Sequence, residues 1–150
     1  MLDNTLFDPE KLSIAAFEMS GAKIYVLEGF ENNQIENFIV ENNLQMASDI
    51  NEKLIKADFS VKISTKSKIN NENEATVNFQ FVVIFKIENL ENLSYADNGK
   101  TIIHHELASA IASTTYATAR GILITKLENT IFQNFILPII NPNKLLENLN

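Results

Sequence analysis

Three segments of this chain, 35–46, 54–66 and 75–88, alternate between apolar and polar side chains with a period of two residues. The pattern is clearest in 75–88, where the odd positions are Ala, Val, Phe, Phe, Val, Phe and Ile. Successive side chains of a strand point to opposite faces, so each segment has one apolar face. This is typical of an antiparallel sheet with one covered side. The Asn-rich residues 68–74 predict a long hairpin between the last two segments.

The apolar face of such a sheet needs a cover, and segment 104–127 is suited to provide it. Its apolar residues recur at helical spacing, which predicts one long amphipathic helix. Gly121 lies inside this helix, so we expect either tight packing or a bend there. The following run, 130–140, is apolar and contains a proline, which favours an extended chain near its end. Asn141-Pro142 then predicts the start of a short last helix.

The N-terminal region has two interpretations. Asp8 can cap a helix and Pro9 fits a first turn, so we predict a helix over 9–20 that ends at Gly21. The competing interpretation is a strand, because 13–17 (Ser-Ile-Ala-Ala-Phe) is short and ambiguous between the two periods. The helix would be an addition to the sheet rather than part of it.

The remaining segments complete a single α+β domain over residues 1–150, with 1–8 as a tail. Segment 23–28 predicts a strand, 47–52 a turn, and 89–101 a loop. The predicted fold class is therefore α+β: a four-stranded antiparallel sheet with one long and one short C-terminal helix, and the extra N-terminal helix as an option. A chain of 150 residues is long enough for one such core.

Charge and cysteine content exclude several functions. The formal net charge is −7, which argues against a nucleic-acid partner because phosphate binding needs clustered Lys and Arg. The chain has no Cys, and therefore no disulfide, thiol nucleophile or Cys-based zinc site. We find no signal peptide and no membrane-spanning run, so we expect a cytoplasmic protein without membrane insertion.

No constellation of residues indicates catalysis, a metal or a cofactor. His104 and His105 are adjacent and do not share a helix face, so we predict no metal site. The carboxylates are scattered, and no Gly-x-Ser-x-Gly, Walker or dinucleotide motif is present. Arg120, the only arginine, lies one turn after Tyr116, and we predict an ion pair within or between subunits for it.

The chain has a surplus of apolar side chains. It contains ten Phe and no Trp, and Phe132 and Phe135 lie in the late apolar run. One helix over a small sheet cannot easily bury all of 131–140 as well as the small-residue face of the helix. The surplus indicates an oligomer interface, an apolar binding groove, or both.

Three stretches carry a resemblance to a known family. Residues 116–120 (Tyr-Ala-Thr-Ala-Arg) resemble the aromatic–Ala–Arg helix segment of SecB-type protein-export chaperones. Residues 135–146 (Phe-Ile-Leu-Pro-Ile-Ile-Asn-Pro-Asn-Lys-Leu-Leu) resemble that family's Leu–Pro–Pro–Ile/Val–Asn stretch, and 84–88 (Ile-Phe-Lys-Ile-Glu) the end of its third strand. The resemblance covers about residues 35–149, and none of the motifs is catalytic.

The resemblance implies a chaperone rather than an enzyme. It implies a homo-oligomer, a dimer of dimers, that binds unfolded preproteins in apolar grooves and delivers them to the ATPase SecA without a cofactor. The predicted client-binding groove comprises Phe38, Val40, Leu44, Phe132, Phe135, Leu137, Ile139, Leu145 and Leu146. The predicted oligomer interface comprises Ala108, Ala112, Thr115, Tyr116, Ala119 and Arg120.

The sequence also departs from the family. Thr115 replaces the proline before the helix aromatic, and 127–129 replaces a glycine-containing turn. Asn78 stands where the family has an acidic residue that docks SecA, and the first 30 residues have no counterpart. A second hypothesis is therefore a SecB-like protein dedicated to one partner, a toxin–antitoxin or secretion-system component. A third is a small-molecule binder or enzyme that uses a cavity between helix and sheet.

Overall fold

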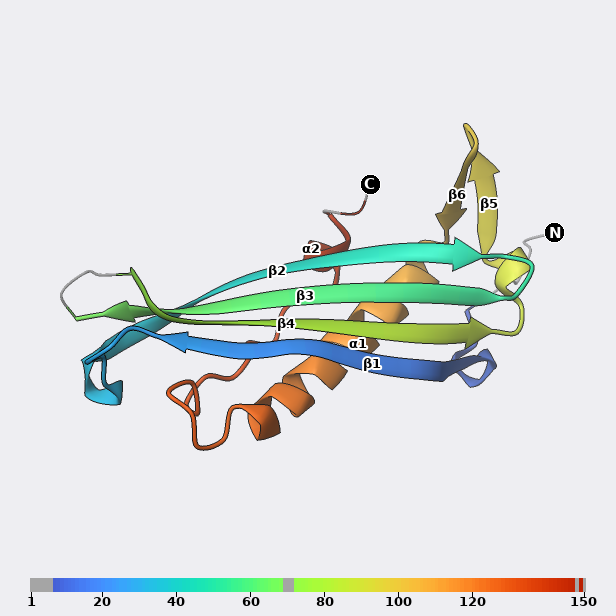
Figure 1. Cartoon of the computed structure of the whole chain (residues 1–150). Coiled ribbons are helices and arrows are strands. Elements are labelled where there is room, and N and C mark those ends of the chain that lie inside the picture. Colours follow the sequence, from blue (N-terminus) through green and yellow to red (C-terminus); the bar gives the residue numbers. More distant parts are fainter. Residues whose placement is uncertain (1–6, 69–71, 148, 150) are drawn as a thin grey trace.

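The computed structural model of the chain describes residues 7–68, 72–147 and 149. Long strands come first, a small hairpin follows, and a long helix precedes the C-terminal segment (Figure 1). In chain order the elements, with η for a 3-10 turn, are η1 (Pro9–Lys11), β1 (Leu12–Val26), η2 (Asn32–Gln34), β2 (Ile35–Asp49), β3 (Leu54–Ser67), β4 (Glu72–Ile87), η3 (Leu90–Asn92), β5 (Ser94–Asp97), β6 (Lys100–Ile103), α1 (His105–Lys126) and α2 (Asn143–Leu146).

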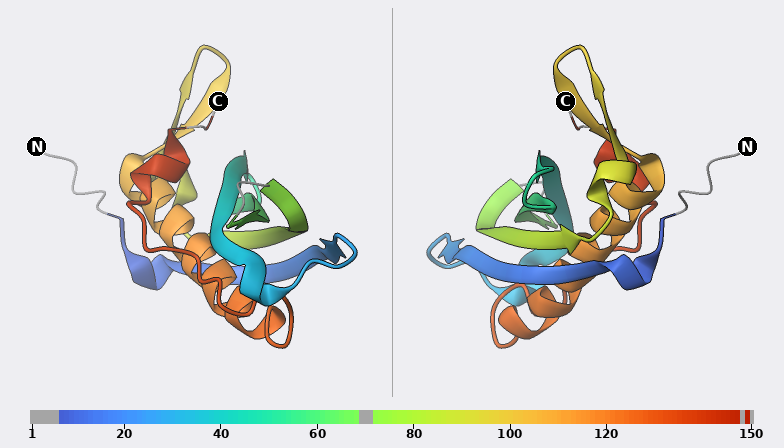
Figure 2. Two further views of the ribbon diagram at one scale, coloured as in Figure 1. Left: turned by 90° about the vertical axis from the view of Figure 1, so that its left-hand side faces the viewer. Right: turned by 90° about the vertical axis from the view of Figure 1, so that its right-hand side faces the viewer.

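The predicted α+β fold is confirmed. The four long strands form one antiparallel sheet in the order β1-β4-β3-β2. The helix α1 runs obliquely across one face of this sheet (Figures 1 and 2), which we call the inner face. The predicted strands at 35–46, 54–66 and 75–88 correspond to β2, β3 and β4, because their two-residue alternation matches the pleat.

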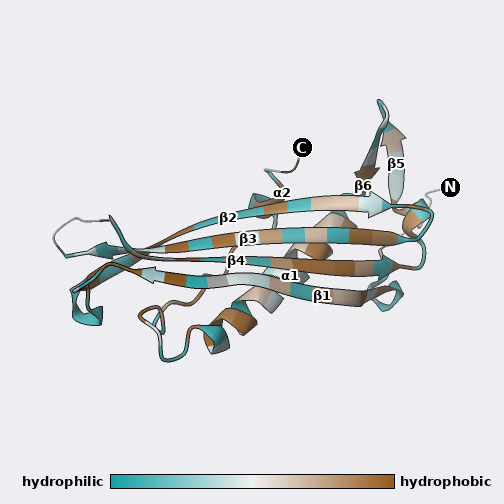
Figure 3. Cartoon of the chain, viewed as in Figure 1, coloured by the Kyte–Doolittle hydropathy of each residue, from teal (hydrophilic) through white to brown (hydrophobic). Residues whose placement is uncertain are grey.

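The inner face of β3 and β4 forms the core. The inward side chains of β3 are at most 2% exposed, and hydropathy alternates along this strand (Figure 3). Phe59 of β3 contacts Phe81 of β4 and Tyr116 of α1, with ring centres 6.3 and 5.7 Å apart. The core therefore connects the sheet to the helix through aromatic contacts.

The predicted helix over 9–20 is wrong, and the competing strand interpretation is right. Residues 9–11 form the turn η1, and β1 continues from Leu12 through the predicted strand 23–28 as far as Val26. The register with β4 shifts between Ile14 and Ala16 and again between Gly21 and Lys23. Each extra residue breaks the two-residue alternation, which explains the helix-like spacing of the sequence.

The predicted loop 89–101 is wrong in part, because it contains η3 and the hairpin β5–β6. The turn of this hairpin is Asn98-Gly99, and both residues have positive φ, 49° and 78°. Asn-Gly between two strands is a strong hairpin signal that the sequence already contains. The hairpin projects from one end of the sheet (Figure 1).

Two turn predictions shift slightly. The turn predicted at 47–52 lies at residues 50–53, because β2 extends to Asp49 and β3 begins at Leu54. The hairpin predicted at 68–74 is consistent with the pairing of β3 and β4, but residues 69–71 lie outside the described residues.

The helical predictions for the C-terminal third agree with the structure. α1 is one residue shorter at each end than predicted, and α2 follows Asn141, whose Oδ1 accepts a hydrogen bond from the Asn143 amide. Gly121 is exposed, and a Cβ added there would meet nothing within 4 Å, so it is not tightly packed. No helix among the described residues is long and apolar enough to cross a membrane.

Candidate functional site

The segment after α1, residues 128–142, returns along the helix and also contacts β2 (Figure 2). Phe38 of β2 contacts Phe132 and Phe135, with ring centres 6.0 and 5.5 Å apart. The Tyr116 hydroxyl donates a hydrogen bond of 2.6 Å to the carbonyl of Pro138, which attaches the segment to α1. The segment is thus held between the helix and an edge strand.

The predicted groove residues fall into three groups. Five are buried in the protomer, three are half-buried, and Ile139 is 88% exposed. The buried side chains contribute to the core. Their role in client binding stays a prediction. The buried group is Leu44, Phe132, Phe135, Leu137 and Leu145, and the half-buried group is Phe38, Val40 and Leu146.

The predicted oligomer interface lies largely inside one protomer. Ala108, Ala112, Thr115, Tyr116 and Ala119 are at most 9% exposed, because this face of α1 packs on the sheet and on the returning segment. Of the predicted set, only Arg120 is half-buried rather than buried. Contact of this stripe with a second protomer is untested, and its burial is already explained by the core.

A small hollow opens between α1 and the returning segment. It has a volume of about 200 Å³ and is lined by Ser113, Tyr116, Arg120, Ile139 and Leu145, among others. We call it the Arg120 hollow. The guanidinium carbon of Arg120 lies 5.9 Å from the centre of the Tyr116 ring. The hollow therefore combines an apolar lining with one cation that rests on an aromatic face.

Burial raises the pKa of the Tyr116 phenol above its ordinary value of 10.0, and the nearby Arg120 guanidinium opposes part of the rise. The phenol therefore stays protonated at neutral pH and keeps its hydrogen bond to Pro138. This bond fixes the wall of the hollow opposite Arg120.

A second hollow of about 240 Å³ lies between the end of β2 and the β5–β6 hairpin. Met46, Ile103, Ala108 and Leu149 are among the residues that line it. It is mainly apolar, and it lies near the N-terminal end of α1. The structure therefore has one hollow near the N-terminal end of α1 and another beside residues 113–120 of the same helix.

An apolar stripe on β1 was not predicted as a site. Ile14, Phe17 and Val26 pair with inward-facing residues of β4, yet they are 51%, 44% and 41% exposed. They share the inner face of the sheet but lie beyond the cover of α1. The helix interpretation of 9–20 concealed this stripe, which the strand interpretation would have placed on the inner face.

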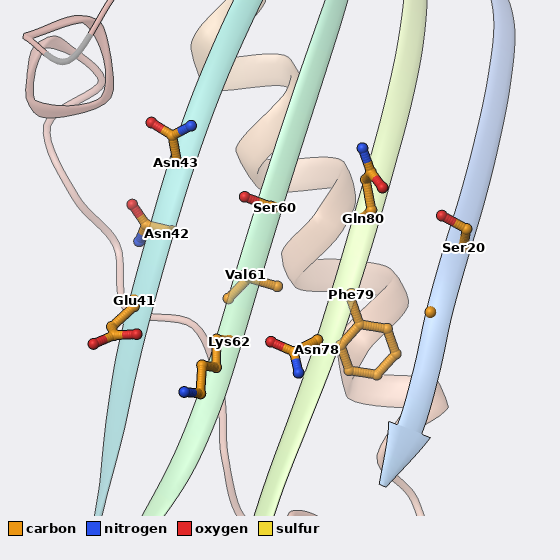
Figure 4. A pocket seen from close by; sticks show the side chains of 11 residues that line it. Ser20, Glu41, Asn42, Asn43, Ser60, Val61, Lys62, Asn78, Phe79 and Gln80 are labelled. Atoms are coloured by element: carbon orange, nitrogen blue, oxygen red, sulfur yellow. The ribbon is translucent and has the colours of Figure 1, made fainter.

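The outer face of the sheet is polar. A shallow hollow of about 490 Å³ extends across all four strands there (Figure 4). Asn78 of β4 pairs with Lys62 on one side and Lys23 on the other, and Lys62 pairs with Glu41 of β2. The position where the family resemblance implies an acidic residue is therefore neutral and flanked by two lysines.

The described residues contain no group of three His, Cys, Asp or Glu side chains that could hold a metal ion. His104 directly precedes α1, and its ring lies 6.0 Å from that of Tyr95. The candidate site thus consists of apolar surface, one arginine and a polar sheet face.

The fold has a counterpart among solved structures. It is similar to a SecB-like chaperone of Mycobacterium tuberculosis, which was solved in complex with a ChAD peptide from the HigA1 antitoxin. The match has a TM-score of 0.60 and 13% sequence identity, and it covers 88% of this chain and 92% of the chaperone chain. No family model matches the sequence, and no curated protein matches it. The likeness establishes a SecB-like fold for this protein.

Proposed function

We propose that this protein is a cytoplasmic, non-enzymatic chaperone that holds unfolded polypeptide segments against apolar surface. The proposal rests on one observation: the returning segment of this SecB-like fold exposes apolar side chains. Ile136 and Ile139 are 61% and 88% exposed in an extended stretch that lies beside the Arg120 hollow. Burying such side chains against a client contributes roughly 25 cal/mol per Å² before ordering costs.

The export version of this proposal is a dimer of dimers that binds unfolded preproteins and delivers them to SecA. The exposed stripe of β1 supports assembly, because an edge strand with an apolar inner face is suited to cover by a second copy. Capacity for several clients would follow from hollows that bind apolar side chains without demanding one sequence.

The second candidate is a chaperone dedicated to one partner, such as a toxin–antitoxin or secretion-system component. Asn78 favours it, because the implied docking acid for SecA is missing and two lysines flank the position. The structurally similar chaperone supports the same candidate, since it was solved in complex with a peptide from an antitoxin.

The test is suppression of aggregation of a chemically unfolded exported protein at stoichiometric amounts without nucleotide. The same protein in its native form and an unrelated unfolded protein are the comparisons. Suppression with both unfolded proteins supports the export version, and SecA binding is then measured directly. Suppression with neither excludes a general holdase and leaves the dedicated partner.

A matched pair of variants tests the surface itself. Ile136→Ala with Ile139→Ala should require about threefold or more protein for the same suppression. Ile124→Ala is the control, because Ile124 is 47% exposed on α1 and lies outside the lining of the hollow. Equal suppression by both variants would contradict a role for the returning segment.

A further inference from the structure

The Arg120 hollow has more chemistry than an apolar groove requires. Arg120 is the only arginine of a chain with formal net charge −7. Within the described part of the chain, the ion pair that forms is between Lys53 and Glu91, and Arg120 has no carboxylate partner within 4.0 Å. A half-buried guanidinium has five N–H donors, and without a described carboxylate within 4.0 Å these donors can bind an anion from a partner.

The other lining side chains leave the donor role to Arg120. The Tyr116 hydroxyl already donates to Pro138, and the Ser113 hydroxyl donates 2.8 Å to the carbonyl of Ser109. The rest of the lining, including Ile139 and Leu145, is apolar. Among the described lining side chains, Arg120 is therefore the one with free hydrogen-bond donors. These N–H groups belong to one positively charged guanidinium.

The size and position of the hollow restrict its ligand. A volume of about 200 Å³ accommodates a side chain rather than a whole cofactor. The backbone beside it is extended from Ile136 to Ile140, and these residues make no backbone–backbone hydrogen bond with any described residue. An extended polypeptide can therefore run alongside this stretch and direct one side chain towards Arg120.

We propose that the Arg120 hollow binds the carboxylate of an acidic side chain within an extended, otherwise apolar segment of a bound polypeptide. This deepens the proposed function and rests on it. Tyr116 positions the guanidinium through its ring, and Ile139 and Leu145 contact the apolar neighbours of the acidic residue. The site thus gives the protein a preference within its clients, for apolar stretches interrupted by Glu or Asp.

The test uses three fluorescein-labelled ten-residue peptides of alternating Leu and Ser. The first carries one central Glu and has both ends blocked. The second carries Gln in its place, and the third carries Gln and a free C-terminal carboxylate. Fluorescence anisotropy at low salt should give about fivefold to tenfold tighter binding of the Glu peptide than of the blocked Gln peptide. Tighter binding of the third peptide alone would assign the site to a chain terminus and overturn the proposal.

Three variants test whether the preference for the Glu peptide depends on Arg120. Arg120→Gln should remove the preference, so that the variant binds the Glu and Gln peptides with equal affinity. Lys126→Gln is the matched control, because it removes the same charge from the exposed last turn of α1, outside the hollow. Arg120→Lys should retain only part of the preference, since an ammonium cannot pair bidentately or stack on Tyr116 as a guanidinium does.

The outcomes separate the site from the general function. Equal binding of the Glu and Gln peptides by the wild type would overturn the carboxylate site and leave the chaperone proposal standing. Failure to bind any peptide would overturn both. If Arg120→Gln lowers the native mass, the anion is supplied by a second copy of the chain, and the proposal is likewise overturned.

Discussion

β3 and β1 both direct apolar side chains to the inner face of one sheet, yet their surroundings differ. The inward residues of β3 are covered completely, whereas Ile14, Phe17 and Val26 of β1 are 41–51% exposed. The cause is the position of α1, which packs on β3 and β4. Alternation in a strand therefore indicates which face is apolar but not what covers it.

The difference divides the sheet into a part that stabilises the protomer and a part that is available to a partner. β1 is an edge strand, so it also presents unpaired backbone groups. β3 lies between two neighbours and has no free edge. Substitutions in the two strands should therefore affect different measurements.

The largest contrast is expected between two phenylalanines. Phe59→Ala should reduce the free energy of unfolding by about 3–5 kcal/mol, because Phe59 is 0% exposed and its removal leaves a cavity. Phe17→Ala should cost about 1 kcal/mol in dilute protein, since the ring is 44% exposed. Urea denaturation measures both values.

Repeating the urea experiment at high protein concentration sharpens the contrast. If a second copy covers β1, the loss caused by Phe17→Ala increases with concentration, and that caused by Phe59→Ala changes little. Equal losses for the two variants in dilute protein would contradict the division of the sheet.

A smaller effect tests whether β1 is held at its bulge. Gly21 has φ +94°, and a Cβ there would lie 2.6 Å from the carbonyl oxygen of Asn78. Gly21→Ala should therefore destabilise the protein by about 2 kcal/mol. Gly121→Ala is the control of opposite sign, expected to stabilise by up to about 1 kcal/mol because Gly121 is helical and unobstructed. Thermal unfolding of both variants measures this, and a neutral Gly21→Ala would show that the bulge relaxes easily.

The smallest effect concerns the hydrogen bond from the Tyr116 hydroxyl to Pro138, which attaches the returning segment to α1. Tyr116→Phe should cost about 1 kcal/mol at neutral pH, because the donor to Pro138 is lost. The pKa of the native phenol is raised, so the native state favours the protonated form. The advantage of the wild type is present below pH 10.0 and is lost as the pH rises above it.

Urea unfolding of the wild type and the variant at about pH 8 and about pH 11 checks the sign of this dependence. Tyr25→Phe is the control, because it removes the same hydroxyl from a residue that is 56% exposed. A difference between wild type and Tyr116→Phe that grows with pH would contradict the assignment.

The sequence predicted β2, β3, β4 and α1 because each keeps one period over most of its length. It predicts a helix in place of the first half of β1, where two register shifts disturb the period, and a loop in place of β5–β6, although Asn98-Gly99 is a hairpin signal. The apolar character of residues 130–140 also did not indicate which of their side chains are buried and which are exposed. Phe132 is 0% and Ile139 88% exposed, and only the path of the returning segment distinguishes them.

Arg120 illustrates what could be predicted of the candidate site. Its place on α1 after Tyr116 was readable from the sequence, and the structure adds the ring contact of 5.9 Å. The ion pair predicted within the subunit does not form among the described residues. Whether the charge has a partner depends on residues distant in sequence, which no local pattern specifies.

The strand order has a consequence for the way the chain folds. β2, β3 and β4 follow one another as hairpins, with Asp49 paired to Leu54 across a short turn. β1 pairs with β4 instead, so that Leu12 meets Ile87 only after a long loop has closed. Closing a long loop costs entropy before any contact is gained. The hairpins β2–β3 and β3–β4 can therefore form first. β1, which carries the exposed apolar stripe, then adds to the edge of β4.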